Sequence, residues 1–338
     1  MSADAHTAAM VTSVSPFPSA VPARAVVPPP EFEDVVTWAA WLYYVDELTQ
    51  SDVAHRLGVS RASVANYLHD ARERGTVVIR IATEAVERTA LSRRLADVFG
   101  LAAASVIPSV PGRAAVDRLG EAGARILADQ LAPGDTIGVA WGKTVLAAAR
   151  AMPALERRDV TVVQVAGSGI STENFSPEFC TAILANQLGA RCVNLHAPAI
   201  LSTPRLRDLL MEEPSLSRQF EMIHSATRII FGVGDLGSGS TYVESGIGGA
   251  DALDTIARTG AAGVLLGRLI DAAGRPLETE IERHMIGLSL QDLKGIPTRL
   301  CIAGGLEKVG ALRAALRGGY VTHLVTESET AEALLTGA

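Results

Sequence analysis

The stretch LTQSDVAHRLGVSRASVANYLHDARERGTVVIRI, residues 48–81, decides the fold of the first patterned part of the chain. It contains two short segments, 50–57 and roughly 61–73, in which apolar residues recur at helical spacing. Thr49 precedes the first segment and Ser60 precedes the second, and both residue types are good helix N-caps. We therefore expect two short helices in direct succession.

Gly58 lies between the two segments and supplies a tight turn. The apolar residues that we expect to be buried are Val53, Ala54 and Leu57 in the first helix and Ala62, Leu68 and, in part, Val64 in the second. A helix, a glycine-containing turn and a second capped helix form the helix-turn-helix pattern. The run 76–81, TVVIRI, then predicts the β wing of a winged version.

The helix-turn-helix pattern predicts binding to double-stranded DNA through the polar face of the second helix. Arg can read guanine and Asn can read adenine in the major groove, which favours Arg61 and Asn66 as base-reading residues. Arg72, Arg74 and Arg80 would lie near phosphates and set the register rather than read the sequence. The residues that we expect at DNA are Thr49, Gln50, Ser60, Arg61, Ser63, Asn66, Tyr67, Arg72 and Arg74. The alternative is an ordinary helical hairpin with solvated arginines.

The net charge of the whole chain argues against DNA binding. Its formal net charge is −7, and an acidic surface repels DNA. From His55 to Arg80, however, five arginines stand against Asp70 and Glu73, a local excess of three positive charges. The acidic balance must therefore come from the rest of the chain.

Length and composition limit the remaining classes. The 338 residues suggest about two domains. Three cysteines without a CxxC motif predict neither a disulfide framework nor a thiolate zinc site, and they fit a reducing cytoplasm. No apolar run is long enough for a membrane helix. Six prolines among small residues predict a disordered tail over 1–30. We expect no cofactor and no metal.

After the helix-turn-helix domain, which we place at 31–83, an amphipathic stretch predicts a linker helix and a short connector over 84–105. The remainder, 106–338, alternates between two kinds of segment. Apolar, β-branched runs occur at 136–140, 160–166, 228–233, 284–289, 299–303 and 320–326. Helical stretches occur at 115–131, 144–152, 177–188, from 204 onward, 250–258, 305–317 and 329–335. This alternation predicts an α/β fold, a doubly wound, mostly parallel, Rossmann-like sheet that binds ligands at the carboxyl ends of its strands.

The turn Trp141-Gly142-Lys143-Thr144 follows one predicted strand and opens a helix. Amides at a helix start, a lysine and a threonine hydroxyl suit a phosphate or another small anion. The turn is not a Walker A loop, because that motif needs glycine at the position of Ile137. This departure argues against a kinase-like nucleotide binder. The alternative is a tight turn with a solvated lysine.

Three further turns follow predicted strands. The amides of Gly167 and Ser168 could complete an anion nest, the alternative being a plain turn. The run 231–237, FGVGDLG, matches GxGxxG but lacks the following apolar helix, so we read Gly234 and Asp235 as part of a ligand-lining or plain loop rather than a dinucleotide site. Lys308 follows a Gly-Gly pair and could face an anion, or lie on the surface.

Catalytic constellations are scarce. No histidine pair has metal-ligand spacing such as HExxH, and no GxSxG elbow is present. His196 and His284 lie in or beside apolar runs, which favours hydrogen-bonded core residues over bases. A catalytic pair of carboxylates remains a possible alternative, because the chain contains many Asp and Glu residues.

Taken together, the helix-turn-helix stretch and the segments IGVAWGKTV, VVQVAGS, LHAPAI, FGVGD and HMIGLSLQDLKGIPTRLCIAGGLEKVGALRAALRGGYVTHLVTE resemble the SorC family of sugar-responsive bacterial transcriptional regulators. The resemblance runs from about residue 35 to the C-terminus. It implies a helix-turn-helix joined to a domain shaped like sugar-phosphate isomerases and deaminases, which binds a sugar, polyol or sugar phosphate and controls operator binding. It also implies a homodimer or homotetramer.

The resemblance carries over a small set of effector-pocket residues: Gly142, Lys143, Thr144, Gly167, Ser168 and Lys308. One departure concerns the segment that often reads GAVGD in relatives. Here Gly260-Ala261-Ala262-Gly263 is followed by Val264, so a carboxylate that can hold sugar hydroxyls is missing.

We therefore expect a DNA-binding regulator of a carbohydrate or polyol operon that is not an enzyme. The alternative is a sugar-phosphate isomerase or deaminase with an appended DNA-binding domain. Within the first hypothesis, Lys143 either contacts a phosphate by charge or forms an imine with an open-chain aldose.

Overall fold

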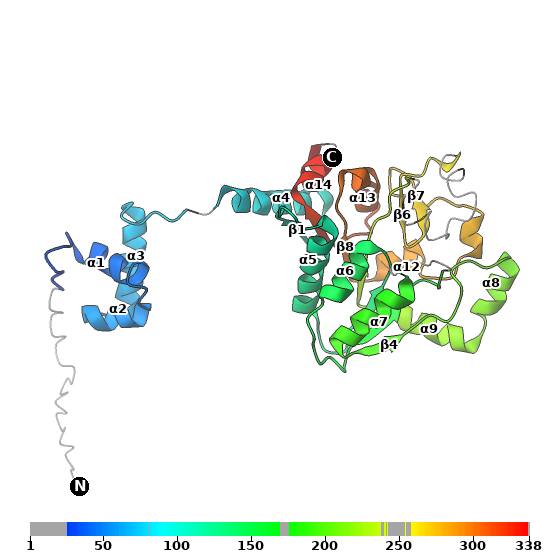
Figure 1. Cartoon of the computed structure of the whole chain (residues 1–338), viewed down its shortest axis with the longest axis horizontal. Helices are drawn as coiled ribbons and strands as arrows, with labels where there is room; N and C mark the ends of the chain where they lie inside the picture. Colours follow the sequence, from blue (N-terminus) through cyan, green and yellow to red (C-terminus); the bar gives the residue numbers. More distant parts are fainter. Residues whose placement is uncertain are drawn as a thin grey trace, which may run out of the picture. The chain divides into compact units, whose positions relative to one another are not determined.

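The computed structural model describes residues 26–80, 82–169, 176–237, 240, 242, 254 and 258–336. The chain divides into two compact units, Met1–Ile81 and Ala82–Ala338, and each is described by itself (Figure 1). The expected tail lies mostly outside the described residues, and so does the helix expected at 250–258.

Unit 1 is a bundle of three helices, α1 (Val35–Tyr44), α2 (Gln50–Leu57) and α3 (Arg61–Glu73). Their inward residues form one small apolar core. It contains Val36, Ala39, Ala40 and Leu42 from α1, Val53, Ala54 and Leu57 from α2, and Val64, Leu68 and Ala71 from α3. The two short helices expected between residues 50 and 73 are confirmed.

The ends of α2 and α3 are set by local chemistry. Thr49 and Asp52 form a reciprocal capping box at the start of α2. Gly58 ends α2 with φ +66°, a conformation that glycine adopts without strain. Ser60 Oγ then accepts the N–H of Ser63 at 3.0 Å and starts α3. The turn between the helices is therefore as short as the sequence predicts.

Two expectations in unit 1 are wrong. Ala62 is exposed, whereas Val64 is completely buried, because the buried stripe of α3 runs through Val64, Leu68 and Ala71. Residues 76–80 form no strand. A strand needs a hydrogen-bonded neighbour, and no second β-prone run follows to make a hairpin with it.

Unit 2 contains a parallel sheet, a separate hairpin and the helices around them. Its strands are β1 (Ala103–Ile107), β2 (Thr136–Val139), β3 (Thr161–Gln164), β4 (Arg191–Val193), β5 (Arg228–Phe231), β6 (Gly263–Leu265), β7 (Arg268–Ile270), β8 (Thr298–Ile302) and β9 (His323–Glu327). Its α-helices are α4 (Thr83–Phe99), α5 (Ala115–Gln130), α6 (Lys143–Ala151), α7 (Pro177–Leu188), α8 (Pro204–Met211), α9 (Pro214–His224), α12 (Leu290–Gly295), α13 (Val309–Arg317) and α14 (Ser328–Thr336). Two short 3-10 helices, η1 (Ile281–His284) and η2 (Leu306–Lys308), complete the described elements.

The main sheet has seven strands in the order β1-β9-β8-β5-β2-β3-β4, and every neighbouring pair is parallel. The chain moves outward from β2 to β4 and then returns to place β5 beside β2. The strand order therefore reverses between β2 and β5, which is where open α/β sheets bind ligands.

Apolar side chains alternate between the two faces of this sheet. In β5, Ile230 packs into a core shared with α5, α6 and α7, whereas Ile229 and Phe231 pack into a core shared with α9, α12 and α13. Helices thus cover both faces, and the expected doubly wound architecture is confirmed (Figure 1).

Five of the six expected strands are present, and the prediction of a strand at 284–289 is wrong. Residues 284–289 form the end of η1 and an extended segment with isolated bridges to Ala166 and Ile200. Gly287 in this segment has φ +148°, which interrupts a regular strand. The four strands β1, β4, β6 and β7 were not expected.

The segment expected as a linker helix and connector, 84–105, is more than a linker. The helical part, α4, ends at Phe99, and the rest enters β1 at the edge of the sheet. Leu95 of α4 is buried in the core of unit 2, and Ser92 Oγ accepts the N–H of Val106 at 3.0 Å. This contact satisfies a backbone donor on the outer side of the edge strand.

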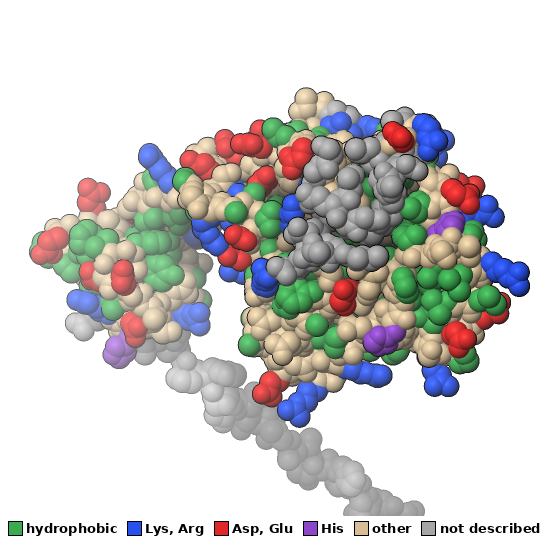
Figure 2. All heavy atoms as spheres, turned by 45° about the vertical axis from the view of Figure 1, so that its right-hand side comes forward, with side chains coloured by type: hydrophobic (Ala, Val, Ile, Leu, Met, Phe, Trp, Pro, Cys, Tyr) green, Lys and Arg blue, Asp and Glu red, His purple; other side chains and the backbone are tan. Residues whose placement is uncertain are grey.

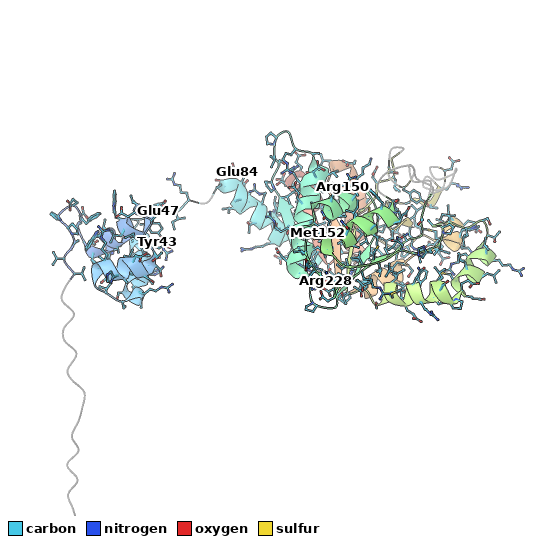
Figure 3. All side chains as sticks on the ribbon, turned by 60° about the horizontal axis from the view of Figure 1, so that its bottom comes forward. Tyr43, Glu47, Glu84, Arg150, Met152 and Arg228 are labelled. Carbon is cyan, nitrogen blue, oxygen red and sulfur yellow. The ribbon has the colours of Figure 1, made fainter. Side chains whose placement is uncertain are left out.

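A polar network lies at the amino-terminal ends of the central strands β2 and β5, opposite the edge of the sheet where ligands are expected. The Asp135 carboxylate accepts hydrogen bonds from Arg228 Nε at 2.6 Å, from Thr227 Oγ1 at 2.7 Å and from the N–H of Ala132 at 2.7 Å (Arg228 is labelled in Figure 3). Burial alone would raise the pKa of Asp135, but these hydrogen bonds lower it below its ordinary value. The charged pair therefore fastens β5 to the turn before β2.

Candidate ligand pocket and nucleic-acid interface

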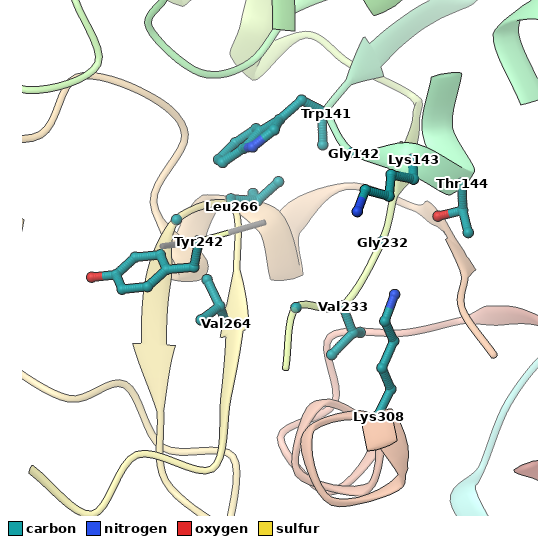
Figure 4. A pocket seen from close by; sticks show the side chains of 13 residues that line it. Trp141, Gly142, Lys143, Thr144, Gly232, Val233, Tyr242, Val264, Leu266 and Lys308 are labelled. Carbon is teal, nitrogen blue, oxygen red and sulfur yellow. The ribbon is translucent and has the colours of Figure 1, made fainter. Parts of the chain in front are cut away.

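A pocket opens at the carboxyl ends of β2 and β5, where the strand order reverses. Its empty space amounts to about 580 Å³ when the part open to solvent is included, and its cavity volume is about 60 Å³. Its described lining residues are Ala140, Trp141, Gly142, Lys143, Thr144, Gly232, Val233, Gly234, Tyr242, Val264, Leu266, Gly267 and Lys308 (Figure 4). The lining thus comes from the β2–α6 turn, the segment after β5, the β6–β7 hairpin and η2.

The β2–α6 turn places the start of a helix at the pocket. Gly142 has φ +122°, which only glycine adopts readily, and α6 begins at the next residue. No side chain caps the amino end of α6 among the described residues. The first amides of a helix carry partial positive charge and suit an anion.

Two lysines from different elements reach into this pocket. Lys143 extends from the first turn of α6 and Lys308 from the end of η2, and their ammonium groups point toward the same space (Figure 4). The described lining residues include no Asp or Glu. The structure thus brings together at one pocket the two lysines that the sequence placed at anion sites.

Thr144 lines the pocket, but its hydroxyl has a structural partner. Thr144 Oγ1 donates to the carbonyl of Ile302 at 2.8 Å, and the residue is buried. A Cβ added to Gly232 would lie 3.2 Å from this oxygen, which is tighter than an ordinary contact. The hydroxyl therefore ties α6 to β8, and its donor is not available to a ligand in this arrangement.

The segment after β5 pairs with the β6–β7 hairpin. Gly234 and Val264 exchange two backbone hydrogen bonds of 3.0 Å each, so Gly234 lines the pocket with both of its backbone polar groups in use. Asp235 does not line the pocket. Its carboxylate accepts the N–H of Gly237 at 3.2 Å, which makes it part of a loop turn.

Apolar side chains make up one wall of the pocket: Trp141, Val233, Tyr242, Val264 and Leu266 (Figure 4). Two of them also belong to a buried group that we call the shared cluster, which consists of Ala199, Tyr242, Val264, Leu269 and Met285. Val264 stands where the family segment GAVGD carries an aspartate. The wall thus offers an apolar surface beside the two lysines.

Several of these wall residues were not expected. Leu266 and Gly267 form the hairpin turn with φ +51° and φ +77°, the signs of a type I′ turn. The Leu-Gly pair between the short runs GVL and RLI was the signal available for this hairpin. No such local signal placed Tyr242 in the pocket wall, because it lies in the long connection between β5 and β6.

Gly167 and Ser168 lie apart from this pocket, contrary to the expected anion nest. The N–H of Gly167 donates to Ile286 at 3.0 Å, and the N–H of Ser168 donates to Ala197 at 2.9 Å. A Cβ at Gly167 would lie 2.6 Å from the backbone of Ala199, so glycine serves a close approach of two chain segments. These amides hold the fold together and are not available to an anion.

Two thiols lie near the pocket without lining it. Burial raises the pKa of Cys180 to about 12, although a hydrogen bond from the Gly142 backbone opposes this shift. Burial likewise raises the pKa of Cys301 to about 12 against the nearby charge of Lys308. Both groups are therefore neutral thiols at physiological pH and poor nucleophiles.

Within the described ranges, no group of three His, Cys, Asp or Glu side chains could hold a metal ion. No described helix is both long enough and apolar enough to cross a membrane.

In unit 1, the exposed side of α3 carries the residues expected to read DNA. Arg61, Asn66 and Arg72 are exposed, and Tyr67 is half-buried against the core. Arg61 Nε donates to Gln50 Oε1 at 3.4 Å, which brings the starts of α2 and α3 together. Figure 2 shows Lys and Arg side chains on the surface of this unit, among acidic ones.

The remaining expected DNA residues have additional roles in unit 1. Thr49, Ser60 and Ser63 hydroxyls take part in helix capping. Arg74 makes an ion pair of 2.9 Å with Asp34, the N-cap of α1, so it also fastens α3 to α1. A surface ion pair of this kind contributes little energy and can open for a phosphate.

Comparisons with known proteins agree with this arrangement. A family model described as "Putative sugar-binding domain" matches residues 83–336. The chain is 32% identical over 310 residues to the uncharacterized transcriptional regulator YjhU of Escherichia coli, covering 90% of this chain and 94% of YjhU. It is 32% identical over 304 residues to the erythritol catabolism regulatory protein EryD of Brucella abortus, covering 88% and 95%.

A solved structure is also similar over most of the chain. The crystal structure of the full-length sorbitol operon regulator SorC from Klebsiella pneumoniae matches with a TM-score of 0.69 and 27% sequence identity. The match covers 89% of this chain and 98% of that protein.

Proposed function

Because this chain belongs to the SorC family of sugar-binding transcriptional regulators, we propose that it binds operator DNA through α3 and that a phosphorylated small carbohydrate in the pocket controls this binding. The controlled genes would serve carbohydrate or polyol catabolism, as the names of the relatives EryD and SorC indicate for those proteins. The protein would act in the cytoplasm, as an oligomer on a palindromic site.

The observation that carries the ligand class is the pair Lys143 and Lys308, which line one pocket together with the start of α6. Two ammonium groups and helix amides suit a phosphate, whereas an uncharged sugar is usually held by carboxylates and amides. Among the described lining residues, no Asp, Glu, Asn or Gln is present. The apolar wall with Trp141 and Val264 would pack against the carbon skeleton.

The same composition argues against the enzyme alternative. An isomerase or deaminase needs a group that accepts a proton in the pocket. The described lining residues include no His, Asp, Glu or Cys; their polar side chains are two lysines, a tyrosine and a threonine whose hydroxyl donates to Ile302. Lys143 is therefore assigned a charge contact to the phosphate, with imine formation as the minor alternative.

The proposal is tested in two steps with the full chain. A thermal-shift screen compares sugars and polyols with their phosphates, and the phosphates alone should raise the melting temperature, since a ligand specific for the folded state stabilises it. Fluorescence anisotropy then measures binding to the DNA upstream of the protein's own operon, with and without the stabilising compound. The compound should change the affinity for this DNA and leave the affinity for random DNA of equal length unchanged.

Absence of specific binding to the upstream DNA at low salt would contradict the regulator. Stabilisation by free sugars but not by their phosphates would contradict the ligand class and leave the regulator intact. Borohydride trapping with candidate aldoses, followed by mass spectrometry at Lys143, decides between charge contact and imine.

A further inference from the structure

Helix α8 leaves two of its leucines in solvent. Leu206 is 44% exposed and Leu209 is 53% exposed, and no residue of this helix is buried. Three positions apart, the two leucines lie on one side of the helix. Figure 2 brings this side of unit 2 forward and shows a patch of hydrophobic side chains there, bordered by charged ones.

The inner side of α8 is nevertheless held firmly. Leu210 and Met211 pack against the core of unit 2, and Arg207 Nε donates to the carbonyl of Met285 at 3.4 Å. Thr203 caps the helix by accepting the N–H of Leu206 at 3.1 Å. The position of α8 is therefore fixed by its inner side, and the exposed leucines are presented outward on a rigid element.

The exposed side of α8 also has an ordered charge pattern. Arg205 stands at its amino end, and Glu212 and Glu213 follow at its carboxyl end, all three exposed. Asp208, in the middle of the helix, is paired with Arg207 of the same helix at 2.9 Å. Leu206 and Leu209 lie between these charges. Since a helix rises 1.5 Å per residue, Arg205 and Glu213 are about 12 Å apart along the axis.

We propose that α8 pairs with α8 of a second copy of this chain, antiparallel about a two-fold axis near Leu209. Such an arrangement packs Leu209 of one copy against Leu209 of the other and leaves the two Leu206 side chains at the flanks of the contact. It also places Arg205 of each copy beside Glu212 and Glu213 of the other, because reversing the direction of one helix exchanges its charged ends. The charge pattern complements itself only in this antiparallel orientation, and antiparallel helix dipoles favour the same orientation.

Self-complementarity is the observation that selects a second copy as the occupant. A two-fold interface must be complementary to itself, residue by residue. A leucine pair flanked by opposite charges at its two ends satisfies that condition, whereas an unrelated partner would require no such symmetry. The two glutamates also repel an anionic membrane surface.

The test uses sedimentation velocity of the full chain over a range of concentrations. The wild type should associate reversibly, and Leu209→Glu should raise the dissociation constant of one association step by at least about tenfold, because it buries a charge at the centre of the interface. Val98→Glu on α4 is the matched control, since Val98 is 52% exposed and the substitution adds the same charge. Circular dichroism and the melting temperature of each variant verify that it is folded.

A charge reversal gives a second, independent readout. Arg205→Glu alone should weaken the association, and so should Glu212→Arg with Glu213→Arg. All three substitutions together should restore it, because the reversed ends again meet opposite charges. The proposal would be overturned by a monomeric wild type or by an unchanged association of Leu209→Glu. It would also be overturned if the triple variant associated as weakly as the sum of the separate charge reversals predicts. Leucine-dependent capture of a different protein by a monomeric chain would likewise overturn it.

Discussion

Replacing Lys308 by methionine removes one of the two positive charges in the pocket and keeps most of the side-chain volume. Lys308 comes from η2, whereas Lys143 comes from the start of α6 (Figure 4). The described lining residues of the pocket include no Asp or Glu. We expect Lys308→Met to weaken the binding of phosphorylated ligands and to leave the fold intact.

The magnitude follows from the bond that is lost. A hydrogen bond to a charged group contributes about 1.5–3 kcal/mol, so the dissociation constant for a phosphorylated ligand should rise about 10- to 150-fold. A ligand present at one hundred times its dissociation constant stabilises the folded protein by about 2.7 kcal/mol. After a hundredfold weakening, the same concentration stabilises it by only about 0.4 kcal/mol.

Thermal unfolding measures this difference directly. For a domain the size of unit 2, 1 kcal/mol shifts the melting temperature by about 2–4 °C. The ligand-induced shift should therefore fall from about 5–11 °C in the wild type to about 1–2 °C in Lys308→Met. Isothermal titration calorimetry with the same compound then gives the dissociation constants themselves.

The control is the unphosphorylated form of the same compound, for which both proteins should show equally weak binding. An equal loss of affinity for both forms would place the effect on the sugar rather than on the phosphate. An unchanged affinity for the phosphorylated form would refute the assignment of Lys308 to the anion.

Three further predictions concern other parts of the chain. Asn66→Ala should cost about 1–3 kcal/mol on operator DNA and nothing on random DNA, whereas Arg72→Ala should weaken both equally and reduce the salt dependence, as measured by fluorescence anisotropy. Asp135→Asn should destabilise unit 2 by about 3–5 kcal/mol in urea unfolding at pH 7, because it leaves its buried arginine partner uncompensated. Since the folded-state pKa of Asp135 is lowered, this stabilisation is present above the ordinary pKa of aspartate and is lost as the pH falls through the lowered value, so wild type and variant should converge in acid. Gly120→Ala should lower the melting temperature sharply, since the new Cβ would lie 2.5 Å from Ala147 of α6, whereas Gly310→Ala, which meets nothing within 4 Å, should not.

Much of the fold could be predicted because its signals are local. Capping residues, Gly58 and the period of apolar residues define α2 and α3, since each of these acts within a few positions. The turn at Gly142 and Lys143 could be found for a similar reason: a buried strand, a glycine and a helix start follow one another directly. Its place in the sheet followed from the general rule for parallel strands.

The missed features depend on contacts between distant segments. β1 lies in a stretch that reads as small residues after a helix, and only its pairing with β9 makes it a strand. The hairpin of Val264 and Leu266 becomes a pocket wall because Gly234 pairs with it across a long excursion of the chain. Gly167 illustrates the converse, since its position after a strand resembled an anion site, whereas its amide is used by a neighbouring segment.

The shared cluster connects the wall of the pocket to α8 through direct contacts. Val264 and Tyr242 line the pocket, and Met285 of the same cluster accepts a hydrogen bond from Arg207 of α8. Coupling free energies are reciprocal. If a bound ligand strengthens the pairing of α8 between two copies, then this pairing strengthens ligand binding by the same free energy. The apparent ligand affinity would then vary with protein concentration, and a titration at a single concentration would report a mixture of the free and the paired chain.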